Sequence, residues 1–157
     1  MPAFMFLPQA SNPVKRAKIA ALGAKIIEVG KDITDAYRGA TAFAQAERPY
    51  FLNNATDPDL PAGPATIACE ILEVLAETGA IYVPMGDAAL IRGIAAAAKQ
   101  VSPKVRIVGV QAERAPSYYY LSWRQGSVGA TESCDTIADG LATRTPEAAK
   151  AKVPSIS

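Results

Sequence analysis

The sequence contains no histidine among its 157 residues, and it contains only two cysteines. The absence of histidine excludes a Ser-His-Asp or Cys-His triad, an imidazole general base and any metal site with histidine ligands. Cys69 and Cys134 are too few and too far apart to form a disulfide framework or a zinc site, so we expect no metal. The groups that remain available for catalysis are Lys, Cys, Asp, Glu, Tyr, Ser and a bound cofactor.

The sequence also lacks a charge excess and a long apolar run. Its 16 basic residues oppose 15 acidic ones without a polybasic run, which gives no support for a nucleic-acid or membrane-surface partner. No apolar run approaches the length of a membrane span, and Ala3–Leu7 is too short for a signal peptide. We therefore expect a soluble cytoplasmic protein with no nucleic-acid or membrane partner.

The hydrophobic residues, which make up half of the chain, alternate between short apolar runs and helical spacing. Asn12 and Asp32 are typical residues to begin helices, and further helical faces begin at Ile67 and Leu90. Short strands are predicted at Ala3–Leu7, Lys25–Val29, Tyr50–Leu52, Ala80–Met85 and Val105–Val110. This order predicts an α/β protein with mostly parallel sheets and flanking helices, similar to a Rossmann fold.

A stretch rich in proline, aspartate and asparagine, residues 53–64, interrupts this alternation and predicts a crossing between two lobes. We expect residues 1–56 to form a βαβαβ segment and residues 57–146 to form a second α/β segment. Residues 147–157 are expected to form a tail that is either helical or frayed.

The candidate binding site is the turn after the fourth predicted strand, formed by Gly86, Asp87, Ala88, Ala89 and Leu90. Open α/β sheets bind ligands beyond the carboxyl ends of their strands, and backbone N–H groups at a helix start bind anions. The turn therefore predicts a site for a small anion. An ordinary turn in which Asp87 caps the helix is the alternative, and its carboxylate would repel a phosphate unless it points away.

Several other side chains are of types that occur in active sites, but their pattern in the sequence does not assign a catalytic role to them. The carboxylates could act as acids or bases, or serve only as turn and cap residues: Asp57, Asp59, Asp135 and Asp139. Tyr118–Tyr120 and Trp123 could form an aromatic platform or pack in a core, and a short helix is predicted over 117–124. No catalytic residue is assigned from these patterns.

Five segments of the sequence resemble, in the same order, segments of fold type II (β-family) pyridoxal phosphate enzymes in the threonine dehydratase and threonine synthase branch. The segments are Asn12–Val29, Ala62–Glu73, Val83–Ile94, Val105–Val110 and Asp135–Ala142. The resemblance implies a two-lobed α/β fold, pyridoxal phosphate as cofactor, and dehydration or deamination of hydroxy amino acids. It also implies that residues 86–90 correspond to the phosphate-binding loop of the family.

Departures from the family pattern imply a truncated homologue that is inactive alone. The sequence has no counterpart of the Ser-x-Lys segment whose lysine holds the cofactor, or of the Ser-Gly-Asn-His loop. Covalent binding of pyridoxal phosphate is therefore not expected. Gln111 stands where several members place a glutamate metal ligand, which again predicts no metal.

Two alternatives stay open: a small-anion-binding or protein-interaction module without catalysis, and an active enzyme that uses another lysine such as Lys15. Missing strands would leave apolar surfaces exposed, so we expect a homo-oligomer, most simply a two-fold dimer.

Overall fold

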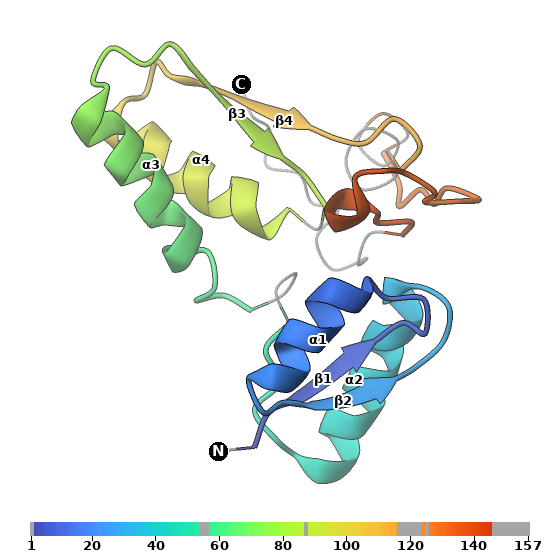
Figure 1. The fold of residues 1–157 in the computed structure, drawn as a ribbon. Helices are drawn as coiled ribbons and strands as arrows, with labels where there is room; N and C mark the ends of the chain where they lie inside the picture. Colours follow the sequence, from blue (N-terminus) through green and yellow to red (C-terminus); the bar gives the residue numbers. More distant parts are fainter. Residues whose placement is uncertain (1, 54–56, 87, 116–123, 125, 146–157) are drawn as a thin grey trace. The chain divides into compact units, whose positions relative to one another are not determined.

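A computed structural model describes residues 2–53, 57–86, 88–115, 124 and 126–145. The chain divides into two units, residues 1–52 and residues 53–157, called unit 1 and unit 2 below. Each unit contains one pair of parallel strands with flanking helices, which confirms the predicted α/β class (Figure 1). The predicted lobe boundary between residues 56 and 57 stays a prediction.

Unit 1 follows a strand-helix-strand-helix order. Its elements are β1 (Phe4–Leu7), α1 (Pro13–Ala21), β2 (Lys25–Glu28) and α2 (Ile33–Glu47). The strands pair in parallel, with Phe4 beside Lys25 and Leu7 beside Glu28. The two helices lie on opposite faces of this strand pair, as expected when a parallel ladder is covered on both sides (Figure 1).

The face of unit 1 under α2 is aromatic. The ring centroid of Phe43 lies 5.0 Å from that of Phe4 and 5.5 Å from that of Phe6, with tilted ring planes. The ammonium group of Lys25 lies 5.5 Å from the centroid of Phe4 on the same face. These contacts hold α2 against β1.

Both helices of unit 1 begin with side-chain caps, as the sequence predicts. The Asn12 side chain accepts hydrogen bonds from the N–H groups of Val14 and Lys15 at 3.0 and 3.2 Å, with Pro13 at the first helical position. The Asp32 carboxylate accepts from the N–H of Asp35 at 3.0 Å and starts α2. These caps satisfy backbone donors that have no partner inside the helix.

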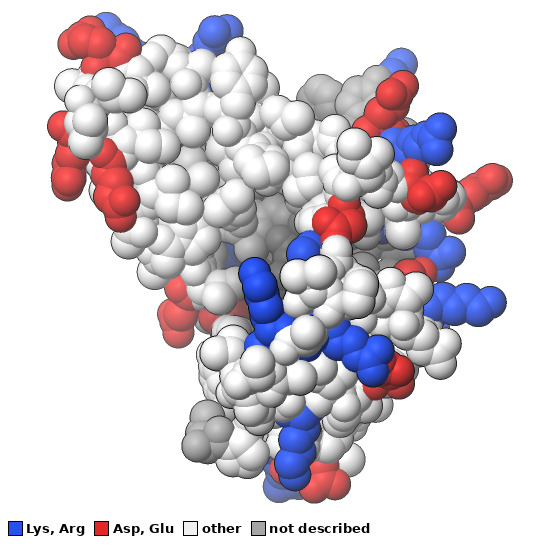
Figure 2. Space-filling model, in the orientation of Figure 1, with Lys and Arg blue, Asp and Glu red and all other residues white. Residues whose placement is uncertain are grey.

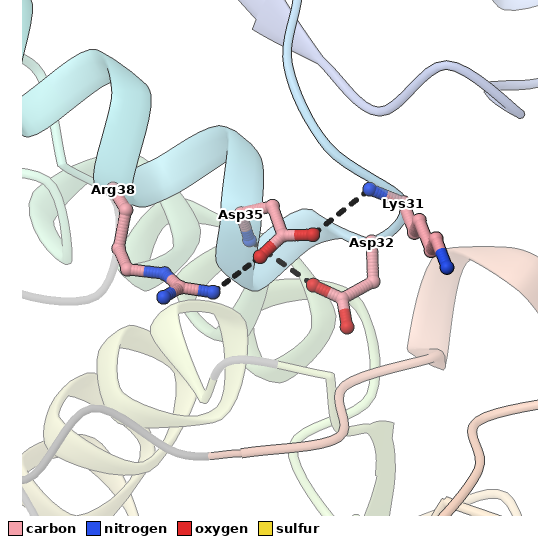
Figure 3. A network of polar contacts seen from close by, with 4 residues as sticks. All are labelled: Lys31, Asp32, Asp35 and Arg38. Atoms are coloured by element: carbon pink, nitrogen blue, oxygen red, sulfur yellow. Dashed lines mark hydrogen bonds and ion pairs between the residues drawn. The ribbon is translucent and has the colours of Figure 1, made fainter.

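Asp35 completes a polar network at the start of α2 (Figure 3). Its carboxylate accepts a hydrogen bond from the N–H of Lys31 at 2.9 Å and pairs with the guanidinium group of Arg38. The hydrogen bond from Lys31 is the largest of the effects that lower the pKa of Asp35. Gly30 has a φ of +67°, and a Cβ there would overlap the Asp35 side chain, so this network requires glycine at position 30.

Unit 2 contains α3 (Ala62–Val74), β3 (Ala80–Pro84), α4 (Ala89–Val101), β4 (Arg106–Val110) and the short 3-10 helix η2 (Asp139–Leu141). β3 and β4 pair in parallel, and α3 and α4 lie together on one side of them (Figure 1). The core consists of apolar residues from these elements: Ala68, Leu72, Ile81, Val83, Ile94, Ala98 and Val105. Alternation along β3 leaves Tyr82 and Pro84 exposed on the other face.

The two helices of unit 2 cross closely at a glycine. A Cβ on Gly93 would overlap the carbonyl oxygen of Pro61 and would lie 2.7 Å from the Cβ of Pro64 and 2.9 Å from the backbone nitrogen of Ala65. Gly93 therefore allows the start of α3 to approach α4 at backbone distance. This approach helps to position α4, whose N-terminus carries the candidate site.

The strand predicted at Tyr50–Leu52 is wrong. This segment has no regular secondary structure, and Tyr50 and Leu52 are exposed. A strand needs a ladder partner, and in unit 1 the ladder consists of β1 and β2 alone among the described residues. Most of the predicted helix over 117–124 and the whole of the tail, residues 147–157, lie outside the described residues.

Candidate functional site

The candidate site lies where β3 leads into α4. The N–H of Met85 donates to the carbonyl of Val110 at 2.8 Å, which closes the ladder at the carboxyl ends of both strands. Met85 is buried, and Gly86 then takes the chain out of the sheet. The turn therefore lies at the edge of the sheet where α/β proteins bind ligands.

The residues after Gly86 form an unusually compact helix start. Ala88 has a left-handed backbone with a φ of +70°, a conformation that favours glycine, and it is the N-cap residue of α4. Ala88 and Ala89 are buried, and Leu90 packs against the core of unit 2. Asp87 lies outside the described residues, so the alternative in which it caps α4 is not tested.

An alanine at the N-cap has no side-chain group that could accept a hydrogen bond from the helix. At the start of α4 the N–H of Arg92 donates to the carbonyl of Ala88 at 3.1 Å. In the described part of the chain, no side chain accepts from the N–H groups of Leu90 and Ile91. These donors, together with the positive end of a 13-residue helix, fit an anion.

A distant part of the sequence covers the turn. A Cβ on Gly86 would lie 3.1 Å from the carbonyl oxygen of Gly140, 3.5 Å from the Cα of Leu141 and 3.7 Å from the hydroxyl of Thr143. The segment around η2 therefore packs against Gly86, and a larger residue at position 86 would push it away. Spacing along the sequence does not indicate this contact, and the resemblance of Asp135–Ala142 to the family was not used to predict it.

The other carboxylates named from the sequence have local roles. Asp57 accepts hydrogen bonds from the N–H groups of Asp59 and Leu60 at 2.9 and 3.1 Å, which forms a turn before α3. Asp135 lies 3.9 Å from Arg114 in an exposed ion pair, and Asp139 is the first residue of η2. Asp139 belongs to the η2 segment that packs against Gly86, whereas Asp57 and Asp59 lie in the turn before α3.

Within the described ranges, no group of three or more cysteine, aspartate or glutamate side chains could hold a metal ion. Cys69 and Cys134 are free thiols. Residues 118–120 and Trp123, named as a possible aromatic platform, lie outside the described residues. The described helices include none that is long and apolar enough to cross a bilayer.

The charged side chains of unit 2 are unevenly placed. On the face shown in Figure 2, the surface over α3 and α4 is largely uncharged, and side chains of both charges lie along its margin. Residues of these helices contribute large exposed apolar groups, among them Val74 at 81 % and Val101 at 60 % exposure. Exposed apolar surface of this kind is typical of surfaces that contact other protein.

Comparison with known proteins places the chain in a family. Residues 1–156 match the family described as "Pyridoxal-phosphate dependent enzyme". The chain belongs to this family. The chain is similar to the L-threonine ammonia-lyase of Geobacter sulfurreducens, with 34 % identity over 146 residues, 93 % of this chain and 36 % of that protein. The L-threo-3-hydroxyaspartate ammonia-lyase of Saccharomyces cerevisiae is 35 % identical over 145 residues, 92 % of this chain and 44 % of that protein.

Solved structures of the family confirm the fold. The processed form of threonine deaminase isoform 2 from Solanum lycopersicum superposes with a TM-score of 0.82 at 28 % identity, covering 96 % of this chain and 41 % of that one. Maize serine racemase superposes with a TM-score of 0.79 at 27 % identity, covering 92 % and 44 %. The chain thus spans less than half the length of these family members.

The Gly86 turn fits one part of pyridoxal phosphate, namely its phosphate group, because it offers backbone donors at a helix start. It does not offer the lysine that holds the cofactor. The described lysines of unit 2 are Lys99 and Lys104, and Lys99 lies ten residues along α4 from Ala89, which is about 15 Å. Lys99 donates to the carbonyl of Pro103 at 3.2 Å, near the opposite edge of the sheet.

Proposed function

We propose that this chain is a truncated, threonine dehydratase-like homologue that has no catalytic activity alone and binds a small anion at residues 86–90. In the family, pyridoxal phosphate supplies an electron sink for chemistry on amino acids. The part of that chemistry assigned to this chain is recognition of the phosphate group. Dehydration or deamination of a hydroxy amino acid would need further protein. The cytoplasmic location expected from the sequence stays a prediction.

The observation that supports this proposal most directly is the backbone conformation of the turn at the start of α4. Ala88 adopts a left-handed backbone at the start of α4, and its small side chain is buried, so the N–H groups of Leu90 and Ile91 are not covered by a capping group of that residue. The positions of Lys99 and Lys104 support the absence of catalysis, since neither reaches this turn.

A second candidate function, a protein-interaction module, is favoured by a different observation. In unit 1 only Ala36 is buried among the described residues 2–52. A unit of this size with one buried residue gains little from its own hydrophobic core and is stabilised when another surface covers it. We expect that cover to come from a second copy of the chain, which makes the protein a dimer.

The first experiment tests anion binding and catalysis together. Inorganic phosphate at ten times its Kd should stabilise the protein by about 1.4 kcal/mol, which raises the Tm by roughly 3–6 °C. Added pyridoxal phosphate should give no visible imine absorption band, no adduct after borohydride reduction, and no ammonia release from L-threonine. An imine band with ammonia release would show an active enzyme, and mass spectrometry of the reduced adduct would then identify its lysine.

Two glycine variants locate the anion. Gly86→Asp places a carboxylate in the turn and should abolish the phosphate-dependent rise in Tm by repulsion. Gly79→Asp adds the same charge just before the other end of β3, where a side chain has open space, and should retain the rise. An equal response of both variants to phosphate would refute the assignment of residues 86–90.

A further inference from the structure

A segment that is distant in the sequence packs on the Gly86 turn within unit 2. This segment, residues 138–143, contains η2, and the carbonyl oxygen of Gly140 would lie 3.1 Å from a Cβ at position 86. The Cα of Leu141 would lie 3.5 Å from the same Cβ. Because Gly86 has no side chain, the two backbones lie in direct contact at this point. The turn is therefore supported by a contact that does not come from its own strand or helix.

The backbone of the turn is strained at Ala88. This residue has a φ of 70° and a ψ of 0°, a left-handed conformation in which the Cβ of any residue except glycine is crowded. A strained conformation of this kind persists only where the surrounding contacts fix it. Along the chain these contacts are the bonds from Met85 to Val110 and from Arg92 to Ala88. Residues 138–143 supply a further contact from outside the turn.

Residues 138–143 have little core of their own. None of the residues 126–145, all of which the structure describes, is buried. Short backbone bonds order the segment: the N–H of Leu141 donates to the carbonyl of Ala138, and the N–H of Thr143 donates to the carbonyl of Leu141, both at 2.8 Å. A segment with few buried contacts opens locally at a low cost in free energy. We therefore expect its docking on Gly86 to respond to small changes at the turn.

We propose that residues 138–143 position the Gly86 turn for anion binding, so that docking of this segment and binding of the anion stabilise each other. The contact at Gly86 supports the left-handed backbone of Ala88, which in turn directs the N–H groups at the start of α4 toward the anion. Gly140 and Leu141 are positioning residues, because they act through Gly86. This inference rests on the anion site proposed above and adds its dependence on a second segment.

The first measurement uses the unmodified chain and inorganic phosphate. Coupling between two events is reciprocal, so an anion that binds more tightly when the segment is docked also stabilises the docked segment. Saturating phosphate should slow the amide exchange of Leu141 and Thr143, measured by NMR, at least about fivefold. The N–H of Leu22, which donates to the carbonyl of Lys18 in unit 1, is the control and should exchange at an unchanged rate. Phosphate binding without slower exchange in the segment would overturn the proposal and leave the anion site in place.

Two glycine variants change the contact from its two sides. Gly86→Ala places a methyl group 3.1 Å from the carbonyl oxygen of Gly140, so it should loosen the segment and raise the phosphate Kd at least about threefold. Gly140→Ala places the same methyl group where no atom lies within 4 Å, and it should change the Kd less than about twofold. Neither glycine has a left-handed backbone, so alanine is not strained at either position. The same Kd for both variants would overturn the proposal.

A proline variant acts on the segment alone. Leu141→Pro removes the N–H that donates to the carbonyl of Ala138 and leaves residues 86–90 unchanged in sequence. It should speed the amide exchange of Thr143 and raise the phosphate Kd at least about fivefold, as the reciprocal coupling requires. Faster exchange with an unchanged Kd would mean that the segment covers the turn without positioning it, and the proposal would be wrong.

The variant Ala88→Gly tests whether the segment acts through the strained backbone. Glycine adopts the left-handed conformation without strain, so the turn should then need less support from residues 138–143. The increase in Kd caused by Leu141→Pro should be at least about twofold smaller when Ala88→Gly is also present. An increase of the same size in both backgrounds would refute positioning through Ala88. If phosphate does not raise the Tm of the unmodified chain, the anion site itself is refuted and this inference with it, so the two failures are distinguishable.

Discussion

Unit 1 and unit 2 share one design, a pair of parallel strands with two helices, yet they are stabilised differently. Unit 2 has a connected core in which Val83 and Val105 are each 1 % exposed. Unit 1 has a single buried residue in its described part, Ala36, and its first helix buries none. Its order depends on local features instead: the caps at Asn12 and Asp32, and the Asp35 network of Figure 3.

The two units differ in how closely their helices cover the strands. In unit 2 the approach at Gly93 brings α3 and α4 into backbone contact over the strands. In unit 1 the helices lie on opposite faces and do not share a core. Parallel strands are ordinarily buried on both faces within larger sheets, and the two described strands of unit 1 are not buried in this way.

The largest expected effect is a loss of stability of unit 2 when the close contact between its two helices is disrupted. Gly93→Ala should lower the free energy of unfolding of unit 2 by at least about 3 kcal/mol, because the new methyl group overlaps the backbone of α3. Gly63→Ala is the matched control, since a Cβ there meets nothing within 4 Å. It should be neutral or stabilising by about 0.5–1 kcal/mol through helix propensity. Urea unfolding with amide exchange resolved by unit would measure both, and equal costs would refute close helix contact.

A smaller effect tests the local stabilisation of unit 1. Gly30→Ala should destabilise unit 1 by about 2 kcal/mol, since alanine is strained at positive φ and its methyl group overlaps Asp35. Gly23→Ala has the same backbone strain, with a φ of +82° and no atom within 4 Å, and should cost about 1 kcal/mol. The difference between the two variants, measured by amide exchange in α2, reports the contact with Asp35. Equal destabilisation by the two variants would mean that the contact with Asp35 contributes little to the stability of unit 1.

The smallest effect is the pH dependence of unit 1. The pKa of Asp35 is lowered by the hydrogen bond from Lys31, followed by effects that include Arg38. A lowered pKa in the folded state stabilises the fold above the ordinary value of 3.8, and this stabilisation is lost as the pH falls through the lowered pKa. Asp35→Asn should therefore reduce the acid-dependent loss of protection in α2 and leave unit 2 unchanged. An unchanged acid response in the variant would remove Asp35 as its cause.

Local patterns in the sequence predicted most of the elements because their causes are local. Asn12 with Pro13 and Asp32 start helices through bonds to residues two or three positions away, so spacing alone identifies them. Alternation in β3 likewise predicts which residues are buried. The segment Tyr50–Leu52 has similar apolar character but forms no strand, because a strand depends on a neighbour that is distant in sequence.

The sequence predicted the position of the turn at the candidate site, but it did not predict which residues pack against that turn. Small residues after β3 identify Gly86–Leu90 from the sequence, and the left-handed Ala88 is consistent with a tight turn. The packing of Gly140 and Thr143 against Gly86 joins segments more than fifty positions apart. Such contacts depend on the path of the whole chain, which composition and periodicity do not specify.

By itself, the sequence determined the α/β class, the helix starts, the family and the lack of histidine chemistry, because each of these follows from residue type and short-range order. The tertiary structure alone decided that, among the described residues, unit 2 has a connected core while unit 1 has one buried residue. The physical reason is that burial and strand pairing are properties of surfaces brought together from distant parts of a chain. An apolar run such as Phe4–Leu7 shows only that a strand needs covering, not what covers it.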